Sequence, residues 1–230
     1  MTAKRQNEAV NIRLVFFGDS ICVGQGISIH KGWVPRIASS VEQLAASHGK
    51  PLTVVNASTN GNTTRLALER MPYDVQSHGV DIMLVQFGLN DCNHWVSDNG
   101  LPRVSPKGFA ANLEEIIERG RRFGAKKILI NTNHPTTRDS DIMPGSGATY
   151  EAHNRRYNAI IREVAAHAGG DVLLNDIERV FLDHTGGVKE RLAELLLSDA
   201  LHLSLKGHDL YYEVMRPRVT AAVEHALRAT

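Results

Sequence analysis

Cysteine is scarce in this chain, with only Cys22 and Cys92 among 230 residues. A disulfide framework is therefore excluded, and we expect both thiols to be buried and unreactive. Long hydrophobic runs are absent as well, since no stretch approaches the roughly 20 apolar residues that a membrane-spanning helix needs. The apolar run Ile12–Phe17 is too short for a signal-peptide core. These absences predict a cytoplasmic protein without a membrane span.

An excess of charge of either sign is also lacking. Lysine and arginine number 26 against 25 acidic residues, which gives a formal net charge of +1. A nucleic-acid partner is not expected, because such binding requires a basic surface. The glycine patterns of dinucleotide and P-loop sites are missing, and the eleven histidines show no zinc-site spacing. We therefore predict a chain without cofactor or metal that forms one domain over residues 1–230.

Apolar runs of strand length alternate with segments of helical periodicity. The predicted strands are Ile12–Phe17, Leu52–Asn56, Asp81–Phe87, Lys127–Asn131 and Val172–Asn175. They are almost continuously apolar, as expected of strands that are covered on both faces. The predicted helices are Trp33–His48, Ser105–Phe123, Tyr150–His167 and Leu205–Leu227, and Pro217 is expected to kink or interrupt the last one. The alternation predicts an α/β fold, a parallel sheet between two layers of helices.

Polar residues of catalytic type follow the first three predicted strands. In an open parallel sheet, ligands bind beyond the carboxyl ends of the strands. Ser20 follows the first strand and could be a nucleophile, although a serine at this place often only caps the next helix. Gly61 follows the second and could offer its N–H to an oxyanion, or could serve only the turn geometry. Asn90 follows the third and could donate its amide or form an Asx turn.

Asp199 and His202 stand three residues apart before the last predicted helix. A nucleophilic serine needs a base that accepts its proton, and the base needs a group that fixes its tautomer. This pair could supply both, although such a spacing alone is common. Together with the residues that follow the strands, it supplies every part of an acyl-transfer site, and this coincidence favours a serine hydrolase.

Four segments resemble, in order and at similar spacing, the sequence blocks of the SGNH hydrolases, the GDSL-type esterases. They are GDS at Gly18–Ser20, NGNT at Asn60–Thr63, GLND at Gly88–Asp91 and DALH at Asp199–His202. The resemblance extends over nearly the whole chain.

The resemblance implies a role for each matching residue. Ser20 would be the nucleophile, His202 the base and Asp199 the residue that orients the base. The oxyanion hole would consist of the backbone N–H groups of Ser20 and Gly61 and the side chain of Asn90. The family also implies a flavodoxin-like, five-stranded sheet of order 2-1-3-4-5, a three-layer sandwich and no metal.

Other residues are expected near the cleft. Asp19, His94 and His134 follow strands and could contact substrate. The irregular segment Thr132–Thr149 is long for a compact domain, and a loop of that length is more often functional than idle.

The predicted reaction is hydrolysis of a small acyl ester through an acyl-enzyme at Ser20. Polar residues in the loops favour O-acetyl or other short acyl groups on a carbohydrate as the substrate; they are Asn60, Asn62, Asn93, His94, Asn133 and His134. A lysophospholipase or thioesterase would use the same site. A non-catalytic ligand-binding module with the same fold is a further alternative, because fold does not determine function.

Overall fold

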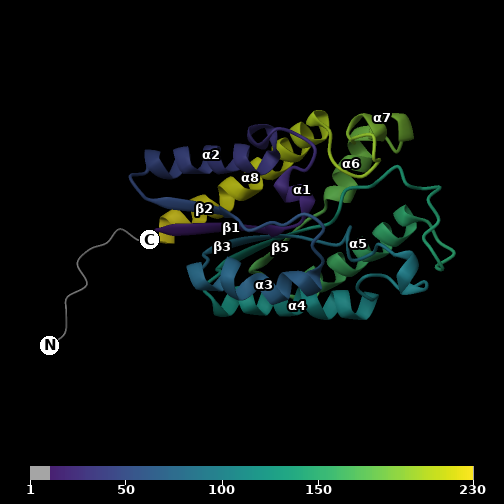
Figure 1. The fold of residues 1–230 in the computed structure, drawn as a ribbon. Coiled ribbons are helices and arrows are strands. Elements are labelled where there is room, and N and C mark those ends of the chain that lie inside the picture. Colours follow the sequence, from purple (N-terminus) through teal and green to yellow (C-terminus); the bar gives the residue numbers. More distant parts are fainter. Residues whose placement is uncertain (1–10, 230) are drawn as a thin grey trace.

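Five parallel strands form one sheet in the computed structural model, which describes residues 11–229 (Figure 1). The strands are β1 (Ile12–Gly18), β2 (Leu52–Asn56), β3 (Ile82–Gln86), β4 (Lys127–Asn131) and β5 (Val172–Asn175). Their order is β2-β1-β3-β4-β5, as the resemblance implied. Residues 1–10 and 230 lie outside the described residues, so the single domain over residues 1–230 stays a prediction.

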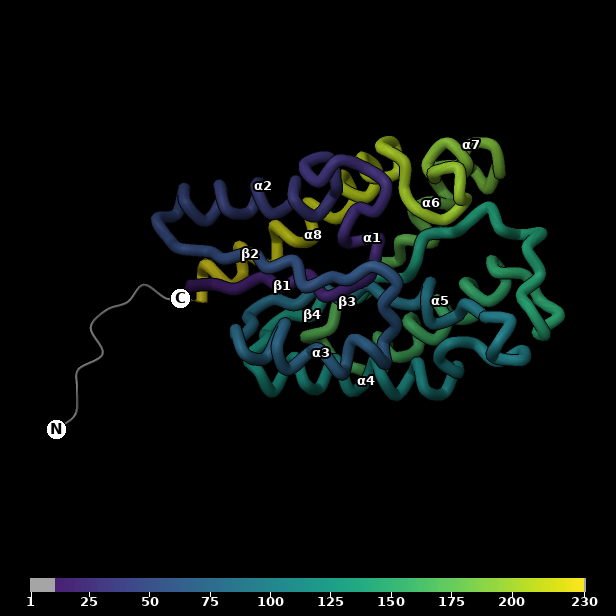
Figure 2. The backbone as a smooth tube through the Cα atoms, viewed as in Figure 1, coloured from purple at the N-terminus to yellow at the C-terminus, as the bar shows by residue number. Residues whose placement is uncertain are grey.

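Helices cover both faces of the sheet. Along one face lie α2 (Trp33–Ser47) and α8 (Leu205–Ala229), and along the other lie α3 (Thr64–Asp74), α4 (Pro106–Arg122) and α5 (Tyr150–His167). The backbone trace in Figure 2 shows the two helical layers with the strands between them. The predicted three-layer architecture is confirmed. It directs the carboxyl ends of all five strands to one edge, where the loops gather.

Three short helices lie at this edge of the fold and were not predicted. They are α1 (Ser20–Val23), α6 (Ile177–Thr185) and α7 (Lys189–Glu194), and short 3₁₀ turns occur at Ile29–Lys31, Gln76–His78 and Val96–Asp98. So few turns give only a weak periodic signal in a sequence.

The last helix differs from the prediction, because α8 runs as one element through Pro217. Met215 and Val219, which flank the proline, are fully buried. Their packing holds the helix against the core and overrides the helix-breaking tendency of proline.

Aromatic packing fixes α2, α8 and the start of α1 relative to the sheet. The Trp33 ring stacks on Tyr211 at 4.6 Å and meets the edge of Phe16 at 5.6 Å between centroids. Its indole Nε1 donates to the Ile21 carbonyl at 2.9 Å. A fully buried tryptophan with its polar atom paired in this way contributes both apolar contact area and orientation. The residue after Ser20 is therefore fastened to the core.

A buried polar network joins α8 to the sheet. The Tyr211 hydroxyl donates to Gln86 Oε1 and accepts from Asn131 Nδ2, and the amide of Asn175 donates to Asn131 Oδ1. All four residues are essentially unexposed. Because an unpaired buried polar group costs about 1–3 kcal/mol, these bonds specify one position for α8 on β3, β4 and β5.

Asp91, which follows β3, fastens the start of α3. Its Oδ1 accepts from the Thr64 backbone N–H at 2.9 Å and from the Thr64 hydroxyl at 2.6 Å. The carboxyl is fully buried, and burial raises its pKa to about 6, although the bonds from Thr64 act in the opposite direction.

Gly207 allows α8 to approach the segment that precedes the Asp199–His202 loop. A Cβ at this position would lie 2.1 Å from the Leu195 carbonyl oxygen, which is backbone and cannot rotate away. We expect Gly207→Ala to lower the free energy of unfolding by about 1–3 kcal/mol, as overpacking does. Urea denaturation measures this loss. Gly170→Ala is the control, since a Cβ there meets nothing within 4 Å. Equal stability of Gly207→Ala and wild type would contradict the close approach.

Asp91→Asn tests the buried carboxyl through the pH dependence of stability. A folded-state pKa of about 6, against the ordinary 3.8, means that protonated Asp91 stabilises the fold at low pH and that this contribution is lost as the pH rises through 6. Asparagine stays neutral and keeps the acceptor for Thr64. The free energy of unfolding of the variant, relative to that of wild type, should rise by on the order of 3 kcal/mol between pH 4 and pH 6 and should not rise further above pH 6. Urea denaturation at several pH values in this range measures the difference in unfolding free energy between variant and wild type. A difference that does not change with pH would refute the raised pKa of Asp91.

Candidate active site

Ser20 is the first residue of α1, directly after β1. The N-cap is the preceding residue, Asp19, whose Oδ1 accepts from the Ile21 N–H at 3.0 Å. The capping role considered for Ser20 thus belongs to Asp19, and the serine hydroxyl is free for other contacts. Glycine is required at position 18, because a Cβ there would lie 2.7 Å from Cys22 Sγ. The strand therefore turns into the helix in a narrow space that presents Ser20 at the sheet edge.

His202 lies between Ser20 and Asp199, although 182 residues separate it from the serine. His202 Nε2 is 2.9 Å from Ser20 Oγ, and Nδ1 is 2.5 Å from Asp199 Oδ2. An ionised carboxylate only accepts, so it selects the tautomer with the proton on Nδ1 and leaves Nε2 as an acceptor for the serine hydroxyl. The structure brings together all three residues that the sequence singled out.

The loop of Asp199 and His202 is held by its own hydrogen bonds. Asp199 Oδ1 accepts from the N–H groups of Leu201 and His202 at 3.0 and 2.9 Å. Burial acts to raise the pKa of Asp199, but the bonds from the His202 ring and from these two N–H groups outweigh it and keep the pKa below its ordinary value. Ala200 has a φ of 61°, a left-handed conformation that is unfavourable for alanine and that this turn imposes.

The segment 132–149 packs against that loop. Arg138 donates through Nε and Nη2 to the Asp199 carbonyl at 3.0 and 2.8 Å. The fully buried His134 places Nε2 2.8 Å from the Leu201 carbonyl. Because this segment is itself tied to α5, for example by Asn154 Nδ2 and the His134 carbonyl, it supports the position of His202.

Asn90 lies beside the end of β1 and shares a neighbour with Gly61. Asn90 Nδ2 donates to Asp19 Oδ2 at 3.4 Å, next to Ser20. Gly61 is exposed and has a φ of 73°, a conformation suited to glycine. The guanidinium of Arg103 contacts both residues, at Asn90 Oδ1 and at the Gly61 carbonyl.

The predicted substrate contacts of Asp19, His94 and His134 stay predictions, and all three residues are buried. Asp19 and His134 have no exposed surface, and His94 packs its ring against His153 at 4.4 Å between centroids. Burial raises the pKa of Asp19 to about 7 and lowers that of His134 to about 4. Their roles are helix capping and loop support.

The six polar loop residues that favoured a carbohydrate substrate do not form one polar cleft. Asn62, His94, Asn133 and His134 are buried, which leaves only Asn60 and Asn93 at least partly exposed. Both cysteines are buried, as predicted.

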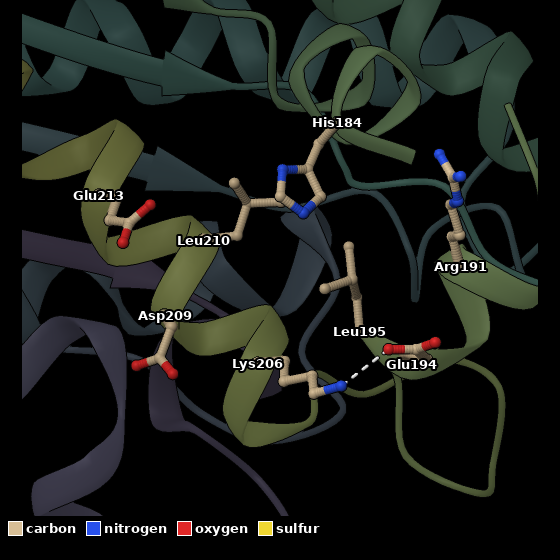
Figure 3. A pocket seen from close by; sticks show the side chains of 8 residues that line it. All are labelled: His184, Arg191, Glu194, Leu195, Lys206, Asp209, Leu210 and Glu213. Carbon is tan, nitrogen blue, oxygen red and sulfur yellow. Dashed lines mark hydrogen bonds and ion pairs between the residues drawn. The ribbon is translucent and has the colours of Figure 1, made fainter. Parts of the chain in front are cut away.

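Two cavities of about 480 Å³ each lie near these loops. The first is lined by Arg103 and by Leu66, Trp95 and Leu101, which are exposed, so it has an apolar wall. Arg103 is its link to the two predicted oxyanion donors, because the guanidinium contacts Asn90 and Gly61. The second lies among α6, α7 and α8, is lined mainly by charged side chains, and contains the Lys206–Glu194 ion pair (Figure 3). None of the predicted site residues lines either cavity.

Three arginines with contacts to the site loops were missed by sequence reasoning. Arg103 and Arg138 are described above, and Arg70 on α3 donates to the carbonyls of Ala57 and Gly18 at 2.5 and 3.1 Å. Each arginine pairs with a residue at least 13 positions away in the sequence. The residues around an arginine do not indicate which distant carbonyl it binds, so these contacts could not be predicted.

Within residues 11–229, no group of three or more metal-ligating side chains is arranged to hold an ion. In the same part of the chain, no helix is both long and apolar enough to cross a membrane. The cytoplasmic location stays a prediction.

Comparisons with known proteins agree with this geometry. The chain is 30% identical to an arylesterase of Vibrio mimicus over 123 residues, 54% of this chain and 56% of the relative. It is 26% identical to esterase TesA of Pseudomonas aeruginosa over 205 residues, 89% and 86% of the two chains. The solved structure of Axe2, an acetylxylan esterase from Geobacillus stearothermophilus, has the same fold, with a TM-score of 0.69 at 20% identity over 89% of this chain and 92% of that one.

The family match covers most of the chain. Residues 16–210, which include every predicted catalytic residue, match the GDSL-like Lipase/Acylhydrolase family. Its members that are named here are esterases, so a small-molecule ester is the substrate class. The chain belongs to the GDSL-like Lipase/Acylhydrolase family and is a hydrolase of ester bonds.

Proposed function

We propose that the protein hydrolyses carboxylic esters through an acyl-enzyme at Ser20. The observation that carries this proposal is the unbroken hydrogen-bonded series from Ser20 Oγ through the His202 ring to Asp199. Ser20 Oγ attacks the acyl carbon while His202 Nε2 accepts the hydroxyl proton. The Asp199 carboxylate stabilises the imidazolium that results, and its low pKa keeps it ionised for this task.

The rest of the cycle follows from the same groups. The imidazolium gives its proton to the alkoxide as the C–O bond breaks, and the alcohol leaves. Water then attacks the acyl-enzyme while His202 accepts its proton. The imidazolium returns that proton to Ser20 Oγ as the acyl–Oγ bond breaks and the acid is released. Charge on the carbonyl oxygen in both tetrahedral intermediates would be stabilised by the N–H groups of Ser20 and Gly61 and by Asn90 Nδ2.

Ser20→Ala tests the nucleophile directly. The variant should fold normally and lose about 10⁴-fold or more in kcat, because the covalent intermediate no longer forms. Hydrolysis of p-nitrophenyl acetate and labelling by a fluorophosphonate measure the two consequences. Ser58→Ala is the control, since Ser58 is a neighbouring serine whose hydroxyl donates to the Phe16 carbonyl. An active Ser20→Ala, or a label on another residue, would refute the assignment, and an inactive, unlabelled wild type would favour a binding module.

For the substrate, we propose O-acetyl or other short acyl groups on a carbohydrate. The fold is shared with an acetylxylan esterase, which supports this class by analogy. Trp95 is 51% exposed beside Arg103 and Asp98 in the cavity with the apolar wall, and Arg103 connects this cavity to Gly61 and Asn90. An indole offers a flat apolar surface to a sugar ring, and charged neighbours can hydrogen-bond to its hydroxyls.

A longer acyl chain, as in a lysophospholipid or an acyl thioester, is the second candidate. The observation that favours it is the apolar wall of the same cavity, where Leu66 and Leu101 are 39% and 68% exposed. Each methylene buried there would contribute roughly 0.8 kcal/mol at most.

A substrate panel separates these classes. We expect kcat/KM to be highest for acetate among p-nitrophenyl esters of rising chain length, and acetylated xylo-oligosaccharides to exceed acyl-CoA thioesters. Trp95→Ala should raise KM for the acetylated oligosaccharide and leave that for p-nitrophenyl acetate nearly unchanged. A steady rise of kcat/KM with chain length would instead establish the acyl-chain reading of the cavity.

A further inference from the structure

Arg103 closes a loop that begins at the predicted oxyanion donor Asn90. The Arg103 N–H donates to the Asn93 carbonyl at 2.9 Å, and the Val104 N–H donates to the Asp91 carbonyl at 3.1 Å. The chain thus leaves β3, makes an excursion and returns beside its own starting point. The Trp95 ring, part of that excursion, lies 4.5 Å from the Arg103 guanidinium carbon. Backbone pairing and ring stacking together define where the guanidinium can lie.

The two terminal nitrogens of this guanidinium reach two different loops. Nη2 donates to the Gly61 carbonyl at 3.1 Å, and Nη1 lies 3.4 Å from Asn90 Oδ1. The planar fork of an arginine is suited to such a bridge, whereas a lysine ammonium is a single point of charge. One side chain therefore links the loop after β2 to the loop after β3.

The bridge has a consequence for the Asn90 amide. A guanidinium has donors and no acceptor, so only the oxygen end of the amide can be its hydrogen-bond partner. The Nδ2 end is then directed to the other side, toward Asp19 Oδ2 at 3.4 Å and the start of α1. A flipped amide would set Nδ2 against the Arg103 donors. The arginine thus selects the orientation in which Asn90 can donate beside Ser20.

A second consequence concerns Gly61. Its side is open, because a Cβ there would meet nothing within 4 Å, and its φ of 73° is in a region that glycine enters and leaves at little cost. The Gly61 carbonyl and N–H belong to adjacent peptide planes joined at one Cα. Holding the carbonyl on Arg103 therefore restricts the direction of the N–H.

We propose that Arg103 is a positioning residue that orients the Asn90 amide and the Gly61 peptide as oxyanion donors. This proposal rests on the esterase mechanism proposed above. Arg103 itself touches neither the serine nor the histidine. Its contribution is preorganisation, because donors that are already directed at the developing charge need no rearrangement during the reaction.

Two other roles would use the same contacts differently. As a substrate-binding residue in the cavity that it lines, Arg103 would change KM. If Arg103 only stabilised the loop, its substitution would lower the stability and the amount of folded enzyme, while each folded molecule kept its kcat. Preorganised donors act on the transition state more than on the ground state, so positioning predicts a loss in kcat with little change in KM.

The experiment compares Arg103→Gln, Arg103→Lys and wild type on p-nitrophenyl acetate, with folded enzyme quantified by circular dichroism. Removing an oxyanion donor costs about 10²–10³ in kcat, so a misoriented donor should cost about 10–100-fold, with KM changed by less than about threefold. Lysine keeps the charge but not the fork and should recover only a small part of the loss. Arg121→Gln is the control, since Arg121 also bridges two acceptors, the Asp171 carboxylate and the Ala168 carbonyl, which lie away from Ser20.

A double-mutant cycle with Asn90→Ala completes the test. Once the amide is gone, Arg103→Gln has only Gly61 left to disturb, so its effect on kcat should be clearly smaller than in wild type. The proposal would be overturned if the kcat losses of Arg103→Gln and Asn90→Ala multiplied in the double mutant. A change confined to KM, or full activity of Arg103→Lys, would overturn it as well. Failure of the mechanism itself has a separate signature, because Ser20→Ala would then remain active whatever Arg103 does.

Discussion

The hydroxyl of Tyr211 is the junction on which the arrangement of the site depends. It donates to Gln86 on β3 and accepts from Asn131 on β4 at 3.2 Å, so one atom joins two strands to α8. The loop that carries Asp199 and His202 directly precedes this helix, which begins at Leu205. A shift of α8 would leave several buried polar groups without partners and would separate the histidine from the serine at the same time.

The loops of the site have a common device, an arginine that binds a backbone carbonyl. Arg70 holds the carbonyls of Gly18 and Ala57 at the ends of β1 and β2, Arg103 holds that of Gly61, and Arg138 holds that of Asp199. A carbonyl has no charge to lose when the pH changes, and arginine stays protonated under all ordinary conditions. These arginine–carbonyl contacts are therefore insensitive to titration, whereas the reaction requires one proton to move between serine and histidine.

The sequence predicted the layers, the strand regions and the residues now found around Ser20, because apolar strands and motifs at strand ends are local signals. It did not predict the contacts of Asp19, whose carboxylate follows a strand as a substrate ligand might but caps α1 instead. Nor did it predict Arg103, because its partners Gly61 and Asn90 become its neighbours only after the sheet is ordered. Pro217 shows the opposite case, in which a strong local signal is overridden by the packing of α8.

The nucleophile lies directly after β1, and its base lies in the segment directly before α8. A chain that ends between Ser20 and His202 consequently contains the serine without the histidine that activates it. The α8 packing that holds the loop extends to Leu227, so the site requires the chain from β1 through α8 to be present and folded. The rate of hydrolysis per mole of protein therefore measures the fraction of a preparation in which β1 and α8 are folded together.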